Sequence, residues 1–302
     1  GVGPGVLDLV GEQLERLLAA APVSKQVVFE IDDLSVAYGS SLAVSKYSKS
    51  PDAAWLFAQW ATSPEDAAID ADAVVTMVAD DAASRDVWLT RDGAAATMKA
   101  GTLAIECSTV SYQHTLDMAR ELQSRGLIYI DCPVTGLPEA AAAGKLTLLV
   151  GADNADLDKA RPFLTPIGST IRHFGAVGTG TVFKLINNLI GAVQIASLAE
   201  GVAIAEQAGL NMQLVAEALG TGAIASPQVI RHSKRMIDRN FSGASFTAAL
   251  RHKDAEYAVR LAETLLPGVP VSRAALTAYD KARAHAPDGD EGQMIEIVSR
   301  PK

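Results

Sequence analysis

The residues best suited to proton transfer stand in the run G-T-G-T-V-F-K-L-I-N-N, residues 178–188. Lys184 and Asn188 are four positions apart, so on a helix they share one face, one turn apart. The two glycines predict a helix start that places Lys184 in about the first turn. There the helix dipole and burial among apolar neighbours would both lower the lysine pKa toward the range useful for general acid–base catalysis. The alternative is a surface lysine whose stem covers apolar surface.

A second pattern, D-C-P-V-T-G over residues 131–136, directly follows an apolar run. Open α/β sheets bind their ligands at the carboxyl ends of strands, which is where this turn would lie. The hydroxyl of Thr135 and the backbone N–H groups of Gly136 and Leu137 are suited to bind a carboxylate. The alternative is a plain strand-to-helix turn.

A third pattern, F-T-A-A-L-R-H-K-D over residues 246–254, lies near the carboxyl terminus. Its Lys253 and Asp254 are candidates for a polar site. The alternative is an exposed ion pair, which contributes little to stability.

Short apolar runs alternate with helical stretches from about residue 70 onward. Runs of this kind are typical of strands buried on both faces of a parallel sheet. The alternation predicts an α/β, doubly wound Rossmann-type domain over residues 1–177 that binds a dinucleotide. The predicted strands are 73–78, 102–108, 127–134, 146–151 and 170–175, and the predicted helices between them are 81–98, 110–125 and 153–166.

The pattern changes at Gly178, where a long connecting helix is predicted over residues 181–208. At 1.5 Å per residue it would be about 42 Å long. Its apolar residues occupy more than one stripe, so it needs burial by a second domain or a second subunit, which predicts a homodimer or homotetramer. An all-α C-terminal domain within residues 178–302 follows, with predicted helices 211–220, 226–238, 247–265, 270–285 and 290–299.

Composition excludes several classes of function. The 302 residues carry a net charge of −9, which argues against binding to nucleic acid or to anionic membranes. No signal peptide is recognised, and the long helix carries too many polar residues for a membrane span. The histidines lack metal-ligand spacing. Cys107 and Cys132 are expected to be buried free thiols, which is compatible with a cytoplasmic protein.

Taken in order, the three patterns resemble the β-hydroxyacid dehydrogenases, a family that includes 3-hydroxyisobutyrate dehydrogenase, tartronate semialdehyde reductase and glyoxylate/succinic semialdehyde reductase. The resemblance covers about residues 44–300 and also includes S-P-E-D-A-A (63–68), M-V-A (77–79) and C-S-T (107–109). It implies an NAD(P)-dependent oxidoreductase that transfers a hydride between nicotinamide and a small β-hydroxyacid or its semialdehyde.

The resemblance also implies roles for individual residues. Lys184 is the catalytic acid/base, and Asn188 holds the substrate and orients Lys184. Thr135, Gly136 and Leu137 bind the substrate carboxylate, and Lys253 reaches into the closed cleft. The remaining implied contacts are with the cofactor: Met77, Val78 and Ala79 lie against its adenosine half, and Thr109 lies near the nicotinamide.

Two features depart from the family pattern. Thr135-Gly136-Leu137 stands where the family usually has Ser-Gly-Gly, so the carboxylate pocket is expected to be narrower or differently shaped. Residues 1–43 do not match, and G-x-G-x-x-G is missing. The segments 27–44 and 51–65 are instead similar to fragments of ABC-transporter ATPases and of sugar-binding proteins. This start is either a divergent one or carries residue identities that differ from those of the molecule.

The choice of cofactor depends on how the chain start is aligned. If residues 47–49 end the second strand, Ser48 and Lys49 suit a 2′-phosphate and NADP is favoured. If GVGPG (1–5) is the phosphate loop, Asp32 would bind a ribose hydroxyl and NAD is favoured. The first alignment agrees with the spacing to Ser63 and is preferred. In either case the first 60 residues or so are expected to form a strand–loop–helix–strand unit that binds the dinucleotide.

Three functions are compatible with these patterns. The first is the hydroxyacid or semialdehyde oxidoreductase with a small carboxylate substrate. The second is an imine reductase of the same fold, against which Lys184 argues because those enzymes typically carry Asp or Tyr there. The third is a catalytically silent cofactor-binding relative, which the missing glycine loop favours and the Lys184/Asn188 pair opposes.

Overall fold

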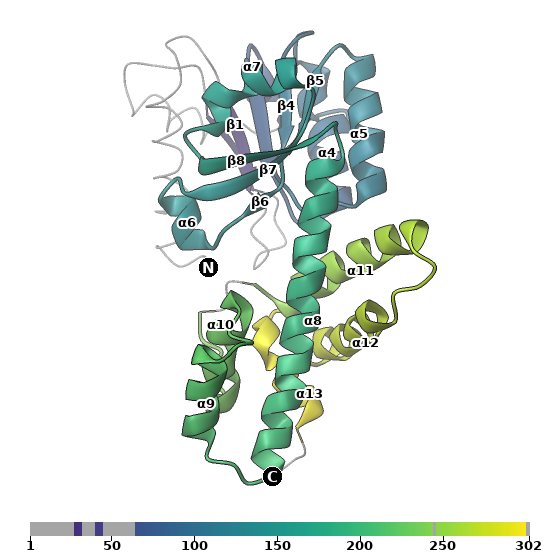
Figure 1. Cartoon of the computed structure of the whole chain (residues 1–302). Coiled ribbons are helices and arrows are strands. Elements are labelled where there is room, and N and C mark those ends of the chain that lie inside the picture. Colours follow the sequence, from purple (N-terminus) through teal and green to yellow (C-terminus); the bar gives the residue numbers. More distant parts are fainter. Residues whose placement is uncertain (1–26, 32–39, 45–63, 244–245, 300–302) are drawn as a thin grey trace. The chain divides into compact units, whose positions relative to one another are not determined.

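The computed structural model describes residues 27–31, 40–44, 64–243 and 246–299 (Figure 1). The chain forms two compact units, Gly1–Lys184 and Leu185–Lys302, whose boundary falls inside helix α8 (Thr179–Gln207). The division predicted at residue 178 lies at the start of the same helix. The predicted cofactor residues Ser48 and Lys49, the GVGPG segment and Asp32 lie outside the described residues.

The first unit is built on one sheet with the strand order β2-β1-β3-β4-β5-β7-β6, and β8 pairs with β7. Strands β1, β3, β4 and β5 are parallel neighbours. The bounds are β1 Val27–Ile31, β2 Ser40–Val44, β3 Ala73–Met77, β4 Leu103–Glu106, β5 Ile128–Asp131, β6 Val134–Thr135, β7 Leu146–Gly151 and β8 Gly168–Gly175.

Side chains of the central strands alternate between two hydrophobic clusters, one on each face of the sheet. In β4, Leu103 and Ile105 belong to the cluster that contains α7 (Asn154–Leu164), and Ala104 belongs to the cluster that contains residues of α4 (Asp81–Leu89) and α5 (Tyr112–Ser124). Helices therefore cover both faces (Figure 1). This confirms the doubly wound fold. Three shorter helices complete the unit: α3 Pro64–Ala68, η1 Ala94–Ala96 and α6 Pro138–Ala142.

The sheet contains antiparallel pairs at both edges. β7 is antiparallel to β5 and β6, because the connection through the five-residue helix α6 is too short for a parallel crossover. β1 and β2 are likewise antiparallel, and only residues 32–39 join them, too few for a helical crossover. The two strands described near the chain start therefore do not form the expected strand–loop–helix–strand unit.

The second unit is entirely helical among its described residues, as the sequence predicted. Its helices pack with the second half of α8 around buried residues such as Ile195, Val202 and Tyr279. The predicted last helix is divided into a 3₁₀ turn and a short α-helix. The bounds are α9 Met212–Thr221, α10 Pro227–Asp238, α11 Ala248–Leu265, α12 Pro270–His285, η2 Glu291–Gln293 and α13 Met294–Val298.

The expectation that helix α8 is too polar to span a membrane is wrong by composition. Its most apolar 18-residue window has a mean hydropathy of 1.5, enough to cross a membrane by length and composition alone. Half of that window is buried inside the protein. Core helices of water-soluble proteins pass the same test, and Leu185, Ile195 and Val202 of α8 are buried in this way.

The start of α8 is fixed by a buried carboxylate at the end of β5. Asp131 Oδ2 accepts hydrogen bonds from the backbone N–H groups of Gly178 (2.9 Å) and Thr181 (3.0 Å). Its Oδ1 accepts one from the Thr181 hydroxyl at 2.6 Å. Burial raises the pKa of Asp131 from 3.8 to about 6, and these hydrogen bonds offset only part of that effect.

Stability should fall with rising pH because of Asp131. The folded-state pKa lies above the ordinary value, so folding favours the protonated form. The resulting stabilisation is fully present below pH 3.8 and is lost as the pH rises through about 6. A difference of this size corresponds to about 3 kcal/mol.

Denaturant unfolding of the wild type and Asp131→Asn at several pH values measures the effect. We expect the free energy of unfolding of the wild type, relative to the variant, to decrease between pH 4 and pH 7. A difference that does not change with pH would contradict the raised pKa.

Candidate active site

Lys184 lies beside the Pro-Val-Thr-Gly turn that the sequence singled out. Its Nζ donates a hydrogen bond of 2.7 Å to the backbone carbonyl of Val134, the residue before Thr135. Because α8 begins at Thr179, Lys184 stands in its second turn and not in the first, where the dipole acts most strongly. The lysine is half-buried, and its neighbour Phe183 is exposed. The structure thus brings the first two predicted patterns together.

The turn itself needs a glycine. Gly136 has φ +144°, and a Cβ there would lie 2.6 Å from Cδ2 of Leu146. This conformation carries the chain from Thr135 at the end of β6 to Leu137, the N-cap residue of α6. The side chain of Leu137 is exposed, while Thr135 is half-buried. The predicted carboxylate-binding residues therefore directly follow the residue whose carbonyl holds Lys184, and their binding role stays a prediction.

Asn188, one helical turn after Lys184, is held by α11. Only 5% of Asn188 is exposed, and its Nδ2 donates to Asp254 Oδ2 at 2.6 Å. Asp254 is also buried, and its Oδ1 lies 3.2 Å from Nζ of Lys253. The alternative of an exposed Lys253–Asp254 pair is therefore wrong. Asn187 Nδ2 donates to Asn188 Oδ1 at 3.0 Å, so both ends of the amide are oriented.

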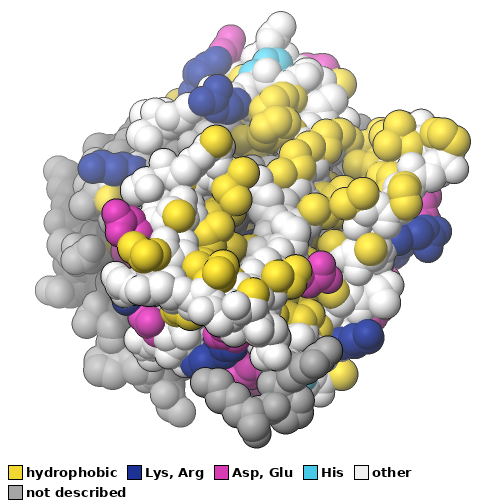
Figure 2. All heavy atoms as spheres, turned by 60° about the horizontal axis from the view of Figure 1, so that its bottom comes forward, with side chains coloured by type: hydrophobic (Ala, Val, Ile, Leu, Met, Phe, Trp, Pro, Cys, Tyr) yellow, Lys and Arg dark blue, Asp and Glu magenta, His cyan; other side chains and the backbone are white. Residues whose placement is uncertain are grey.

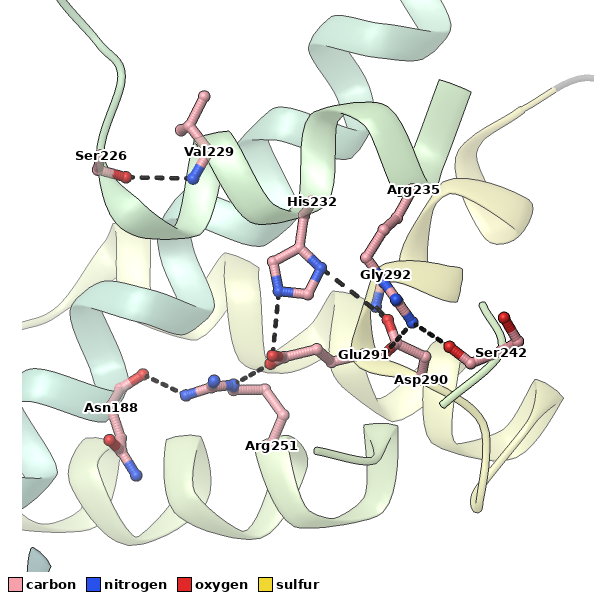
Figure 3. Close-up of polar contacts among 10 residues, drawn as sticks. All are labelled: Asn188, Ser226, Val229, His232, Arg235, Ser242, Arg251, Asp290, Glu291 and Gly292. Carbon is pink, nitrogen blue, oxygen red and sulfur yellow. Dashed lines mark hydrogen bonds and ion pairs between the residues drawn. The ribbon is translucent and has the colours of Figure 1, made fainter. Parts of the chain in front are cut away.

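A buried charge network supports the backbone at the same residue (Figure 3). Arg251 NH1 donates to the carbonyl of Asn188 at 3.2 Å, and its Nε donates to Glu291 Oε2 at 2.6 Å. Glu291 Oε1 lies 3.2 Å from Nε2 of His232. Burial alone would raise the pKa of Glu291, but Arg251 and His232 more than offset this and lower it.

The second carboxylate of this network is Asp290. Its Oδ2 accepts from Arg235 NH2 at 2.8 Å, and its Oδ1 accepts from the backbone N–H of Gly292 at 2.8 Å. Arg235 lies on α10, so the network joins α8, α10, α11 and η2 (Figure 3). Within the described residues, no group of three His, Cys, Asp or Glu side chains could hold a metal ion.

The predicted cofactor residues of the described chain lie at the carboxyl edge of the sheet. Met77 ends β3, and the buried Val78 donates its backbone N–H to Ser108 Oγ at 2.7 Å. Ala79 follows Val78, and the half-buried Thr109 follows Ser108 after β4. The loops after these two parallel strands are therefore adjacent, as a dinucleotide site on this fold requires.

Sequence reasoning missed the Arg251–Glu291 support of Asn188. The spacing of Arg251 and Asp254 places both on one face of α11, a signal that was available. Glu291 lies forty positions from Arg251 in the chain, and no motif connects them. The thiols were predicted correctly: Cys107 and Cys132 are free and buried.

Two family models match successive parts of the chain. Residues 35–175 match the NAD binding domain of 6-phosphogluconate dehydrogenase. Residues 178–298 match the NAD-binding domain of NADP-dependent 3-hydroxyisobutyrate dehydrogenase. The two matches meet near the start of α8.

Individual relatives agree with these models. Glyoxylate/succinic semialdehyde reductase 2 of Arabidopsis thaliana is 29% identical over 82% of this chain and 69% of its own. The NAD-dependent L-serine dehydrogenase of Pseudomonas aeruginosa is 34% identical over 72% of this chain and 76% of its own. The structure of Mycobacterium tuberculosis 3-hydroxyisobutyrate dehydrogenase with L-serine has a TM-score of 0.76 and 26% identity, covering 99% of this chain and 97% of that chain.

Breaking the buried ion pair from one side should cost more than removing both charges. Arg251→Met leaves Glu291 charged and buried, which we expect to lower the free energy of unfolding by about 3–5 kcal/mol. Adding Glu291→Gln to that variant should recover part of the loss. Denaturant unfolding measures both, with Arg161→Met at the exposed Arg161–Asp158 pair as the control, where a change below about 1 kcal/mol is expected. A double variant less stable than Arg251→Met would contradict this account.

Proposed function

The chain belongs to the β-hydroxyacid dehydrogenase family, and we propose that it interconverts a small β-hydroxyacid and its semialdehyde with NAD or NADP. The family supports the reaction class and the cofactor type. The observation that carries the site assignment is the position of the Lys184 amine, 2.7 Å from the carbonyl next to Thr135. This contact supports a site in which Lys184 transfers the proton and the turn at Thr135 holds the carboxylate.

Each side chain has a distinct task in this proposal. Lys184 Nζ takes the proton of the substrate hydroxyl during oxidation and returns it during reduction. The Thr135 hydroxyl and the N–H groups that follow it hold the carboxylate, which fixes the distance between that group and the reacting carbon. The amide of Asn188, oriented by Asp254, binds the substrate oxygen. The nicotinamide of the bound cofactor accepts or gives the hydride.

The described residues fit a nicotinamide dinucleotide. Ligands of open α/β sheets bind at the carboxyl ends of the strands, and residues 77–79 and 107–109 follow β3 and β4 there. Met77 and Val78 offer apolar surface, and Thr109 offers a hydroxyl. We further propose NADP in preference to NAD, because Ser48 and Lys49 suit a 2′-phosphate if residues 47–49 end the second strand. The ratio of KM values for the two cofactors tests this preference.

Two alternatives predict different measurements. An imine reductase would reduce cyclic imines with NADPH and leave semialdehydes unchanged. A silent relative would bind the cofactor and turn over neither class. Lys184, held beside the carboxylate-binding turn, favours the hydroxyacid reaction over both.

Replacing Lys184 should abolish most of the turnover while sparing cofactor binding. We expect Lys184→Ala to lower kcat by roughly 10²–10⁴-fold, because a general acid–base group is lost. Cofactor oxidation is measured with glyoxylate and succinic semialdehyde, and cofactor reduction with 3-hydroxyisobutyrate and L-serine. Lys159→Ala, at an exposed surface lysine of α7, is the matched control. Near-native turnover by Lys184→Ala with the best substrate would refute the assignment.

A second copy of this chain is the partner that we propose for the outer face of α8. Ile190 and Ile204 on this helix are 54% and 68% exposed. Gly201 lies between them in the sequence, and a Cβ atom added to it would have no neighbouring atom within 4 Å. A glycine inside a helix costs about 1 kcal/mol relative to alanine, and a closely packed neighbour would compensate for that cost.

The neighbouring surface is also apolar. A cavity of 650 Å³ between α8, α9 and α10 is lined by Leu198, Val215 and Ile224 among others, and Ile224 is exposed. Figure 2 shows hydrophobic side chains spread over the face that it brings forward, with few charged ones among them. Exposed apolar area of this kind is typical of a surface between subunits. These features support a homodimer or homotetramer.

A charge on this face should therefore weaken assembly. We expect the wild type to sediment as a dimer or tetramer at micromolar concentration, and Ile190→Lys or Ile204→Lys to shift it toward smaller species. Because both side chains are exposed, the thermal stability of the separated subunit should change little. A monomeric wild type would refute the proposal, as would lysine variants that assemble normally. Leu265→Lys, at an exposed residue of α11, is the control.

A further inference from the structure

Another buried carboxylate, that of Glu106 at the end of β4, is not used by the reaction described above. Only 1% of Glu106 is exposed, and four donors surround it. Its Oε1 accepts from the Thr76 hydroxyl (2.9 Å) and from the backbone N–H of Ser108 (3.0 Å). Its Oε2 accepts from the Ser84 hydroxyl (2.6 Å) and from Trp88 Nε1 (3.0 Å). One oxygen thus faces the loop after β4, and the other faces helix α4.

Because of these donors, both side-chain oxygens of Glu106 must act as hydrogen-bond acceptors. The indole N–H of Trp88 and the backbone N–H of Ser108 can only donate. In a glutamine at this position, the NH₂ group would face one of the two in either orientation of the amide. Carboxylates that accept several hydrogen bonds also form the strongest such contacts. The site therefore demands a carboxylate in particular, and a polar side chain of the same size is not sufficient.

The Oε1 atom of Glu106 is connected through Ser108 to the candidate cofactor residues. Ser108, whose N–H is held by Glu106, accepts the backbone N–H of Val78 on its own hydroxyl at 2.7 Å. The Cys107 N–H also donates to the Thr76 carbonyl at 2.8 Å. Ser108 therefore ties the loop after β3 to the loop after β4. Val78 and Ser108 are both buried, so no water competes for these groups.

We propose that Glu106 and Ser108 are positioning residues for the cofactor: the Glu106 carboxylate fixes Ser108, and the Ser108 hydroxyl fixes Val78, so that the segments 77–79 and 107–109 are held in the geometry that binds the dinucleotide. The inference rests on the proposed function, which places the cofactor against these two segments. Under this proposal, Glu106 and Ser108 increase the affinity for the cofactor without needing to contact it.

The test compares two serines of the same network. Ser108→Ala leaves the buried N–H of Val78 without its acceptor, whereas Ser84→Ala removes a donor to the opposite oxygen of Glu106. One hydrogen bond contributes about 0.5–1.5 kcal/mol, which corresponds to roughly 2- to 10-fold in affinity. Fluorescence titration with NADPH and NADH should show Kd increased by that factor in Ser108→Ala and Glu106→Gln, and unchanged in Ser84→Ala.

Further measurements separate positioning from a loss of stability. Thermal unfolding should show Ser84→Ala and Ser108→Ala destabilised to similar extents, although only the second loses affinity. In Ser108→Ala the KM for the cofactor should rise while kcat at saturation stays near the wild-type value, and Ser108→Thr, which keeps the hydroxyl, should restore Kd.

The outcomes distinguish this inference from the proposed function. An unchanged Kd in Ser108→Ala overturns the inference, and so does an equal loss of affinity in Ser84→Ala. If Glu106→Gln does not fold, the serine pair alone decides. A wild type that binds neither NADPH nor NADH would overturn the proposed function itself.

Discussion

The geometry of the candidate site depends on where helix α8 begins, and a single buried carboxylate determines that point. Asp131 binds two backbone N–H groups and one hydroxyl at the helix start, which would otherwise lack partners. Because α8 is continuous from Thr179, the positions of Lys184 and Asn188 along it follow from this start. The same strand end leads into the turn that carries Thr135. The Asp131 side chain thus relates the position of Lys184 to the turn that is proposed to hold the substrate.

The second requirement is a fixed Asn188, and the helical unit meets it from α11. Asp254 holds the side-chain amide, and Arg251 holds the backbone carbonyl. Burying these charges is costly, since a buried ion pair rarely exceeds a well-packed apolar pair in stability. What these charged contacts provide is orientation, because a hydrogen-bonded charge holds a polar group in one direction and apolar packing does not. This arrangement agrees with the proposal that the amide of Asn188 faces a substrate oxygen.

Local patterns predicted the elements well, and they predicted long-range contacts poorly. The continuous apolar runs of β3, β4 and β5 identified buried parallel strands, and the absence of proline over residues 181–208 identified the long helix. The direction of β7 was not predictable in this way, because its apolar run looks the same in a parallel and an antiparallel pair. What reverses β7 is the short connection through α6. Lys184 was placed in about the first turn because the helix was predicted to begin at residue 181, whereas it begins at Thr179.

In the candidate site, too, features within one segment were predictable and long-range contacts were not. The spacing of Lys184 and Asn188 and the Thr135 turn could be recognised, since each lies within one short segment. The partners that orient them could not: Asp254 meets Asn188 across 66 positions, and Glu291 meets Arg251 across 40. Hydrogen-bond partners brought together by tertiary packing leave no periodic signal. The antiparallel pairing of β1 with β2 is likewise a tertiary feature that alternation alone does not reveal.

Three buried carboxylates share one arrangement of hydrogen-bond donors. Asp131, Glu106 and Glu291 each accept from groups that only donate: backbone N–H, indole N–H or guanidinium. At Glu106 an amide would present its own N–H to the indole of Trp88 or to the backbone N–H of Ser108, leaving two donors opposed and both unsatisfied. Each carboxylate also joins separate elements, namely β5 to α8, β4 to α4, and η2 to α11. Because a substitution at any of the three removes contacts to two elements at once, the positions of the attached loops and helices depend on these side chains.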